Sequence, residues 1–325
     1  MKACPSLCLS WLATVALCGG ATGVALAAEA AAAPASTPAP MAPVTVPFDF
    51  SKSAVEVDVS VHGTPLHMLL DTGVNPSVID LATADRLGLP VDRGDGGEAS
   101  GFGDGQGAAV FPATVAGLAI GGQSFAGFDA LAADMGGISA GLGRRVDGVL
   151  GYSFLSDKTV LVDYVAHRVA ILPRAEDAAP LTQACKTRWT ATLKTVDSFP
   201  VIPDFRLGEA RAPVSLDTGS TGQIGLFQSA LGLPGVRAAL QDAGTVVRTG
   251  ARGQARSTRY RFDAPVGFGP FTLPAGASMS TYADAGATDT RVANVGNQLL
   301  AALGLKLLLD YRGQTLGFYG DCLAG

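Results

Sequence analysis

Histidine is scarce in this chain of 325 residues, and its scarcity restricts the available chemistry. The three histidines are His62, His67 and His167. None stands at a metal-ligand spacing from another ligand type, and no Gly-x-Ser-x-Gly elbow is present to hold a serine nucleophile. The sequence therefore contains no residues to carry metal-dependent or serine-dependent hydrolysis, and we expect no metal and no cofactor.

Charged residues are also few, at 16% of the chain, and the formal net charge is −5 with a pI near 5.2. Nothing in this balance suggests a general attraction to nucleic acid or to anionic lipid. After the N-terminus, no apolar stretch approaches the length of a membrane span without a charge, since "LLAALGLKLLLDY" contains Lys306. The length and the 48% hydrophobic content suit a soluble globular protein of about two domain-sized units.

The N-terminus has the pattern of an export signal. Lys2 supplies a positive start, Leu9–Leu17 an apolar stretch, and Ala25–Ala27 a small-x-small cleavage site. We expect a signal peptide over residues 1–27. An Ala/Pro-rich flexible leader without a core of its own is expected over residues 28–45. The alternative is an uncleaved membrane anchor, but glycines interrupt the apolar run.

Cysteine is nearly absent from the predicted mature chain. Three of the five cysteines (Cys4, Cys8 and Cys18) leave with the signal, and only Cys185 and Cys322 remain. Two cysteines in an oxidising compartment suggest one disulfide, the alternative being two free thiols. We therefore expect an exported protein, periplasmic or secreted.

Three pairs of segments match in the same order, one member in each half of the chain. They are Asp71–Gly73 with Asp217–Gly219, Leu87–Pro90 with Leu231–Pro234, and Val160–Tyr164 with Leu307–Tyr311. Their offsets are 146, 144 and 147 residues. An ordered, nearly constant offset indicates a duplicated unit, and a period this long is too large for a solenoid.

The pattern of each copy predicts a set of short strands joined by Gly/Pro turns. Val55–Val61 alternates valine with polar residues, and Leu66–Leu70 returns toward Asp71. In the second copy, Phe199–Leu207 and Ala212–Leu216 repeat this pattern. We predict an all-β protein with an N-terminal β lobe over residues 46–180 and a C-terminal β lobe over residues 181–325.

A duplicated β lobe with one Asp-Thr-Gly in each copy resembles the pepsin-like and retropepsin-like aspartic proteases. The resemblance runs from about Phe48 to Tyr319 and includes Val149–Gly151, which fits the family's apolar-apolar-Gly signature. In the second copy Ala293–Gly296 is a weaker version, with Asn294 at an apolar place. The resemblance implies a bilobal pepsin-like acid protease fold with the active site in the cleft between the lobes.

The resemblance also assigns roles to the two triplets. Asp71 and Asp217 would hold one water between them. At about 3 Å and an effective dielectric near 20, two negative carboxylates repel by roughly 5 kcal/mol, so the pair is expected to share one proton. One acid then serves as base and the other as acid.

The residues around the aspartates support the same interpretation. Thr72 and Thr218 are similar to the family's pair of interlocked threonines, and Gly73 and Gly219 let backbone N–H groups approach the carboxylates. Ser220 follows the second triplet, whereas Val74 follows the first. We expect the Ser220 hydroxyl to donate to Asp217, which makes Asp217 the more ionised acid and Asp71 the protonated one.

A glycine-rich stretch follows the first triplet, and an arginine-rich stretch follows the second. In "SGFGDGQGAAVF", the family resemblance implies a flap over the substrate, with Gly101, Phe102 and Gly103 at its tip; the alternative is a surface hairpin. In the second copy one predicted hairpin contains five arginines, Arg248, Arg252, Arg256, Arg259 and Arg261. They form either a solvated arm or a surface that favours acidic residues in the substrate.

The sequence thus predicts a monomeric aspartic endopeptidase that acts on a peptide or protein substrate. We expect no nucleic-acid partner and no stable membrane insertion after signal cleavage. The alternative is a catalytically weak or inactive peptide-binding protein on the same fold. Val74 and Asn294 keep this alternative open, because the family more often has a small or hydroxyl residue and an aliphatic residue at these places.

Overall fold

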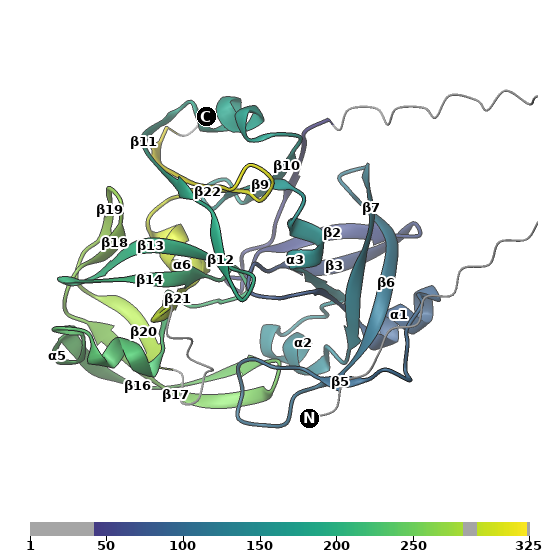
Figure 1. Ribbon diagram of the computed structural model, residues 1–325, viewed down its shortest axis with the longest axis horizontal. Helices are drawn as coiled ribbons and strands as arrows, with labels where there is room; N and C mark the ends of the chain where they lie inside the picture. The colour runs from purple at the N-terminus through teal and green to yellow at the C-terminus, as the bar shows by residue number, and fades with distance from the viewer. Residues whose placement is uncertain (1–41, 282–290, 324–325) are drawn as a thin grey trace, which may run out of the picture. The chain divides into compact units, whose positions relative to one another are not determined.

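The computed structural model describes residues 42–281 and 291–323, most of which lie in β-strands (Figure 1). The expected signal peptide, most of the expected leader, and Cys4, Cys8 and Cys18 lie outside the described residues. The described residues belong to one compact unit, Pro40–Gly325. They form several β-sheets with a few short helices, so the prediction of an all-β fold is confirmed. Among these residues no helix is long and apolar enough to cross a membrane.

The first sheet has seven strands in the order β2-β3-β8-β4-β7-β6-β5. These are β2 (Glu56–Val61), β3 (Thr64–Leu70), β4 (Ser77–Asp80), β5 (Gly97–Glu98), β6 (Ala109–Ile120), β7 (Gln123–Ala133) and β8 (Gly148–Leu150). The predicted alternation appears in β2, where Val57, Val59 and Val61 are buried and Asp58 is exposed.

The second sheet has ten strands and repeats the order of the first. They are β12 (Lys194–Val196), β13 (Phe199–Leu207), β14 (Ala210–Leu216), β15 (Ile224–Leu226), β16 (Leu240–Gly250), β17 (Gly253–Phe262), β18 (Val266–Phe268), β19 (Phe271–Leu273), β20 (Ala277–Thr281) and β21 (Ala293–Val295). The run β13-β14-β21-β15-β20-β17-β16 corresponds to the complete order of the first sheet. In both sheets the strand that leads to Asp-Thr-Gly pairs in parallel with the strand of the apolar-apolar-Gly motif.

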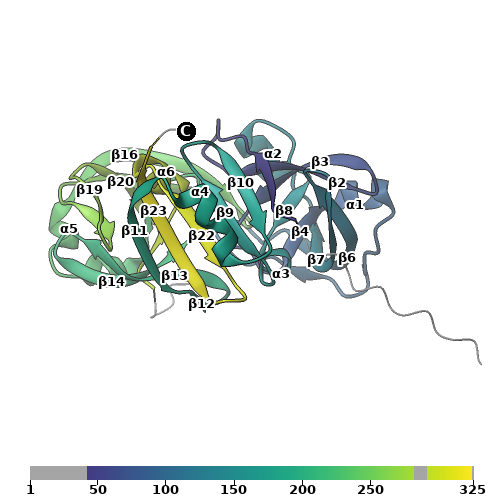
Figure 2. The same ribbon diagram turned by 90° about the horizontal axis from the view of Figure 1, so that it is seen from above.

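The third sheet takes its six strands from both halves of the chain (Figure 2). They are β1 (Val44–Pro47), β9 (Thr159–Asp163), β10 (Arg168–Leu172), β11 (Cys185–Thr192), β22 (Lys306–Asp310) and β23 (Thr315–Cys322). The matched segments around Leu161 and Leu308 pair with each other in antiparallel register. The first described strand begins at Val44, inside the range that the sequence assigned to the leader.

Short helices connect the strands. They are α1 (Leu81–Leu87), α2 (Gly136–Leu142), α3 (Tyr152–Leu155), α4 (Ala179–Thr182), α5 (Val236–Ala239), α6 (Asn297–Ala302) and 3₁₀ turns at Ala175–Ala178 and Gln228–Gly232. Asp80 caps α1 by accepting from the Thr83 N–H, and Gly88 ends it at φ 64°. The equivalent segment of the second copy begins after Phe227, which offers no capping acceptor, and it forms a 3₁₀ turn instead of an α-helix.

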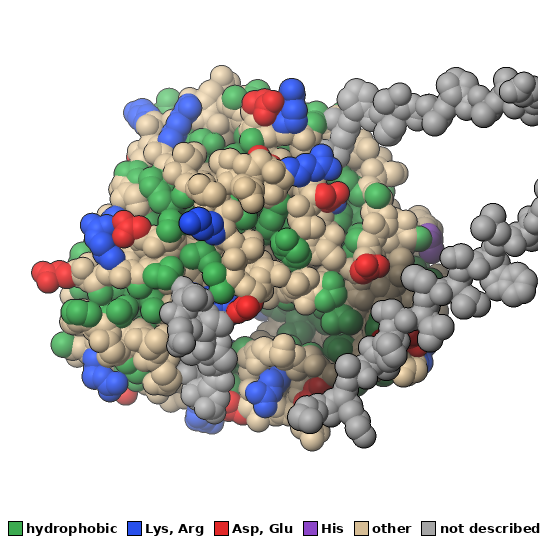
Figure 3. Space-filling view, in the orientation of Figure 1, with side chains coloured by type: hydrophobic (Ala, Val, Ile, Leu, Met, Phe, Trp, Pro, Cys, Tyr) green, Lys and Arg blue, Asp and Glu red, His purple; other side chains and the backbone are tan. Residues whose placement is uncertain are grey.

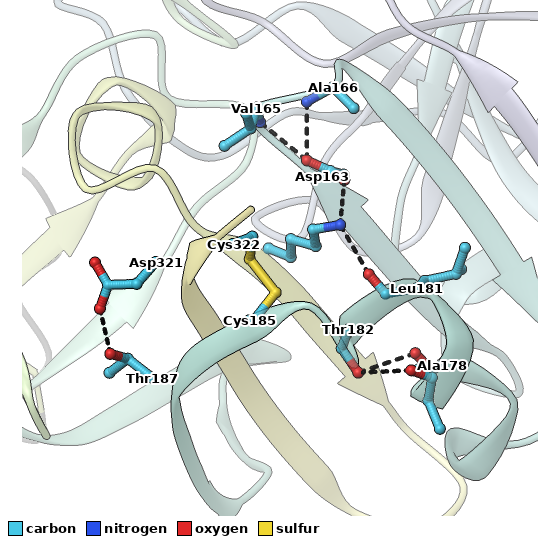
Figure 4. Close-up of a disulfide and its surroundings, with 12 residues drawn as sticks. Asp163, Val165, Ala166, Ala178, Leu181, Thr182, Cys185, Thr187, Asp321 and Cys322 are labelled. Carbon is cyan, nitrogen blue, oxygen red and sulfur yellow. Dashed lines mark hydrogen bonds and ion pairs between the residues drawn. A yellow bond between two sulfur atoms is a disulfide. The ribbon is translucent and has the colours of Figure 1, made fainter. Parts of the chain in front are cut away.

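A disulfide joins Cys185 to Cys322 across 137 residues (Figure 4). The two cysteines are paired in the register of β11 and β23. Nearby, the Lys306 ammonium lies 2.8 Å from an Asp163 oxygen and donates to the Leu181 carbonyl at 2.7 Å. These contacts satisfy the charge that interrupts the late apolar segment.

Candidate active site

Both Asp-Thr-Gly loops begin where a central strand ends. β3 and β14 each stop one residue before an aspartate. The Asp71 N–H donates to the Leu150 carbonyl at 3.0 Å, and the Asp217 N–H donates to the Val295 carbonyl at 2.9 Å. The neighbouring parallel strand therefore fixes the backbone of each aspartate in the same way.

Two buried threonines lock the loops together. The Thr72 hydroxyl donates to the Leu216 carbonyl and the Thr218 hydroxyl to the Leu70 carbonyl, both at 2.8 Å. Each hydroxyl also accepts from the other threonine's N–H, at 3.0 and 3.1 Å. Because both side chains are buried, removing either hydroxyl would leave backbone groups without partners.

Each glycine of the triplets faces the aspartate of the other copy. The Gly73 N–H donates to Asp71 Oδ1 at 2.7 Å, and a Cβ atom at Gly73 would lie 2.9 Å from Asp217 Oδ1. The Gly219 N–H donates to Asp217 Oδ1 at 3.0 Å, and a Cβ atom at Gly219 would overlap the Asp71 carboxyl. Only glycine fits this close approach.

The buried environment keeps Asp71 protonated. Burial and the facing charge of Asp217 raise its pKa to about 8, against the opposing effect of the Gly73 and Gly219 N–H groups. A carboxyl with this pKa retains its proton across mildly acidic and neutral pH. The two acids titrate as a pair, so the proton belongs to the dyad as a whole.

Asp217 is the more easily ionised member of the pair. Burial raises its pKa as well, but four groups oppose that shift: the N–H groups of Gly219 and Ser220, the positive charge of Arg291, and a hydrogen bond from Asp71. The negative charge of the dyad therefore resides mainly on Asp217, and Asp71 donates its proton toward it.

The expectation that the Ser220 hydroxyl sets this difference is wrong. It is the Ser220 backbone N–H that donates to Asp217 Oδ1, at 3.1 Å. Within residues 42–281 and 291–323 no hydrogen bond joins the hydroxyl to this carboxyl. The hydroxyl lies against Gly296 instead, where a Cβ atom would be 2.7 Å from it. Ser220 supports the loop through its backbone.

A polar pair behind the second triplet supplies a further donor. The Asn294 side-chain amide donates to Asp217 Oδ2 at 3.4 Å, and its carbonyl oxygen accepts from the Ser215 hydroxyl. That hydroxyl also lies 3.1 Å from the Ala293 carbonyl oxygen. Both Asn294 and Ser215 are buried. Asn294, which stands where the family more often has an aliphatic residue, therefore contributes a hydrogen-bond donor to Asp217.

Arg291 and Phe199 also belong to this site, although neither was predicted from the sequence to do so. The Arg291 guanidinium carbon lies 4.0 Å from the centre of the Phe199 ring and 5.6 Å from that of Phe227. Phe199 in turn contacts the first loop, because a Cβ atom at Gly73 would be 2.7 Å from its ring. In the sequence, Arg291 is a single arginine two residues before an apolar strand, and an isolated arginine at such a place does not indicate a function.

Gly101, Phe102 and Gly103 lie in the loop of residues 99–108 between β5 and β6. This flap loop contacts the tip of the β16–β17 hairpin (Figure 1). The Arg252 N–H donates to the Phe102 carbonyl at 3.0 Å, and the Gly105 N–H donates to the Arg252 carbonyl at 2.9 Å. Arg252 Nε returns a bond to the Gly105 carbonyl at 3.0 Å. The predicted arginine-rich hairpin is confirmed, and it meets the flap loop directly.

One protonated carboxyl beside one carboxylate provides a general acid and a general base in a single site. Throughout the described ranges, no group of three or more His, Cys, Asp or Glu side chains is placed to hold a metal ion.

Residues 57–154 match the model of a family described as aspartyl protease. The resemblance to aspartyl proteases is therefore confirmed over this part of the chain, which includes Asp71 and the flap loop. The match supports a protease function and peptide substrates in general. The search of curated proteins found no match to the chain.

Proposed function

We propose that this protein is an aspartic endopeptidase whose catalytic pair is Asp71 and Asp217. The observation that carries the proposal is the contact between a protonated Asp71 and a more easily ionised Asp217, held by two interlocked and duplicated loops. The residue types and their surroundings match the needs of hydrolysis by a water held between two acids.

In the first step, the water oxygen attacks the carbonyl carbon of the substrate while the Asp217 carboxylate takes a proton from the water. Asp71 gives its proton to the carbonyl oxygen, and a neutral tetrahedral diol forms. In the second step the C–N bond breaks, and the leaving nitrogen takes the proton now on Asp217. Asp71 recovers a proton from one of the two hydroxyl groups, so the dyad returns to its starting state.

The surrounding structure is suited to an extended peptide. In this proposal the first and second sheets form two lobes, and the peptide lies in the cleft between them beneath the flap loop and the β16–β17 hairpin. Figure 3 shows the surface hollowed next to the place where these two segments meet in Figure 1. Backbone groups of a flap can bind a strand-like peptide, while side-chain pockets set specificity.

We further propose that the protein acts outside the cytoplasm, in the periplasm or as a secreted monomer. Support comes from the export pattern of residues 1–27 and from the Cys185–Cys322 disulfide, which suits an oxidising compartment.

The function can be tested by incubating the protein, begun at Ala28, with a mixed peptide library between mildly acidic and neutral pH. We expect internal cleavage that a statine-type transition-state analogue blocks. The Asp71→Asn/Asp217→Asn double variant, prepared in the same way, controls for contaminating proteases. Peptide binding without cleavage would select the inactive peptide-binding protein instead.

A further inference from the structure

Arg248 lies on the buried face of the β16–β17 hairpin. In the hairpin register Arg248 is opposite Ala255, and Val246 is opposite Ser257. Ala255 and Ser257 are buried, at 5% and 4% exposure. The opposite face carries Arg256, which is exposed, and its register partner Val247 is also exposed. Strand alternation therefore directs Arg248 toward the body of the protein and Arg256 toward solvent.

Contacts near its tip fix the position of this hairpin. Its tip is hydrogen-bonded to the flap loop through Arg252, and α2 packs against β16, where Gly141 approaches Thr249. The hairpin thus joins the flap loop to the second sheet, of which β16 and β17 are themselves strands and in which β14 leads to Asp217.

The Arg248 guanidinium reaches the loop that carries the second catalytic aspartate. A Cβ atom at Gly222 would lie 2.7 Å from Arg248 Nη2 and 2.9 Å from Nη1. Gly222 is three residues beyond Gly219, which contacts Asp71. Because three residues span at most about 11 Å, the guanidinium contacts the same loop that carries the catalytic pair's Asp217.

The charge of Arg248 is uncompensated within the described parts of the chain. Its Nε is buried without a hydrogen-bond partner, as is the Ser257 hydroxyl on the same face. The other arginines of the hairpin are either hydrogen-bonded or exposed: Arg252 is bonded to Gly105, Arg259 to Ala243 and Arg261 to Asp263, and Arg256 is exposed. Leaving polar groups buried and unpaired costs free energy, which a suitable ligand would recover.

We propose that Arg248, with the Ser257 hydroxyl diagonally across the hairpin on the same face, forms a subsite that binds an acidic side chain of the peptide substrate. The guanidinium presents several N–H donors in a planar fork that matches a carboxylate, and the hydroxyl adds one more donor. The inference rests on the proposed protease function and adds a substrate class to it: peptides with Asp or Glu near the scissile bond.

The test uses fluorogenic peptides built on a sequence that the protein cleaves, with Glu or Gln placed in turn at each of the four positions on either side of the scissile bond. We expect the wild-type protein to prefer Glu over Gln at one position by about tenfold in kcat/KM, as a charge-assisted hydrogen bond provides. In Arg248→Gln that ratio should fall close to one. Arg256→Gln, which removes the same charge from the outer face of the same hairpin, should retain it.

Equal cleavage of Glu and Gln peptides by the wild-type protein at every position would overturn the subsite, as would an unchanged ratio in Arg248→Gln. The same peptide pairs are also titrated against Asp71→Asn by fluorescence anisotropy. If the library yields no cleaved peptide, the Glu and Gln pairs are built on a library peptide that binds; Arg248-dependent preference for Glu in binding then supports the subsite, while the protease proposal fails. If peptides are neither cleaved nor bound, both proposals fail.

Discussion

The two Asp-Thr-Gly loops share a backbone but differ in what lies behind them. In the first copy Leu69 pairs in register with Val149, and both belong to an apolar cluster with Met135. In the second copy the same positions are Ser215 and Asn294, which are hydrogen-bonded to each other.

This difference bears on the chemistry, because the Asn294 amide contacts Asp217, whereas Val149 has no polar side-chain atom to offer Asp71. Duplication therefore preserves the geometry of two equivalent acids, and substitutions in one copy make them unequal. In the proposed mechanism, this asymmetry favours Asp71 as the acid and Asp217 as the base.

The largest effect is expected from removing either carboxyl. Asp71→Asn and Asp217→Asn should each lower kcat by about 10⁴-fold or more, because the remaining acid has no partner with which to share a proton. Steady-state cleavage of the best library peptide measures the loss, and circular dichroism checks the fold. If one variant kept wild-type turnover, the two copies would not act as a pair.

The second copy also contains a disulfide, whereas the first copy has none. Replacing Cys185 and Cys322 together by serine should lower the free energy of unfolding by about 2 to 5 kcal/mol, because the disulfide closes a long loop in the unfolded chain. Urea unfolding measures the change. Mass spectrometry of the unreduced exported protein after alkylation provides the direct check, and two alkylated thiols would contradict the bridge.

Arg291 should influence the two acids unequally, since its positive charge favours the ionised form of Asp217. Arg291→Met removes the charge but keeps an apolar stem over Phe199, and it should shift the acid limb of the kcat/KM profile to higher pH. The sign follows because losing a cation raises the pKa of the carboxylate beside it. Arg291→Lys retains the charge and should move the limb less; equal shifts in both variants would point to packing instead of charge.

A smaller shift in the same direction is expected from making the second copy resemble the first. Asn294→Val removes the amide that contacts Asp217 at 3.4 Å, so the acid limb should move to higher pH by less than in Arg291→Met. Ser220→Ala is the matched control and should leave the limb in place, because the backbone N–H of Ser220 is retained. A larger shift in Ser220→Ala than in Asn294→Val would show that the Ser220 hydroxyl, and not the Asn294 amide, favours ionisation of Asp217.

Much of the fold could be predicted because it depends on local patterns. The valine alternation of β2, the strand over Phe199–Leu207 and the arginine-rich hairpin all follow from period-two patterning and turn residues. The repeated triplets identified the aspartates that the structure brings together. The shared third sheet was not predicted, since pairing between β9 and β22 depends on contacts across more than a hundred residues.

The parts of the site that escaped prediction are those set by tertiary contacts. Ser220 offered a hydroxyl in the sequence, yet the turn directs its N–H to Asp217. Arg291 and Phe199 carry no motif and meet only because β13 and the segment before β21 come together. The contact of the flap loop with the hairpin tip joins segments of the two copies that no spacing rule connects.

The central claim is that the two acids share one proton, carried mainly by Asp71. Carbon-13 NMR of protein labelled at the aspartate carboxyl carbons tests it most directly, with Asp71→Asn and Asp217→Asn used to assign the two signals. At pH 6 we expect the Asp71 signal to be that of a protonated carboxyl, which titrates well above the ordinary aspartate pKa of 3.8, and we expect the Asp217 signal to reach the carboxylate form at a lower pH than the Asp71 signal does. Two fully ionised carboxylates at pH 6, both titrating near the ordinary value, would show that the two acids do not share a proton.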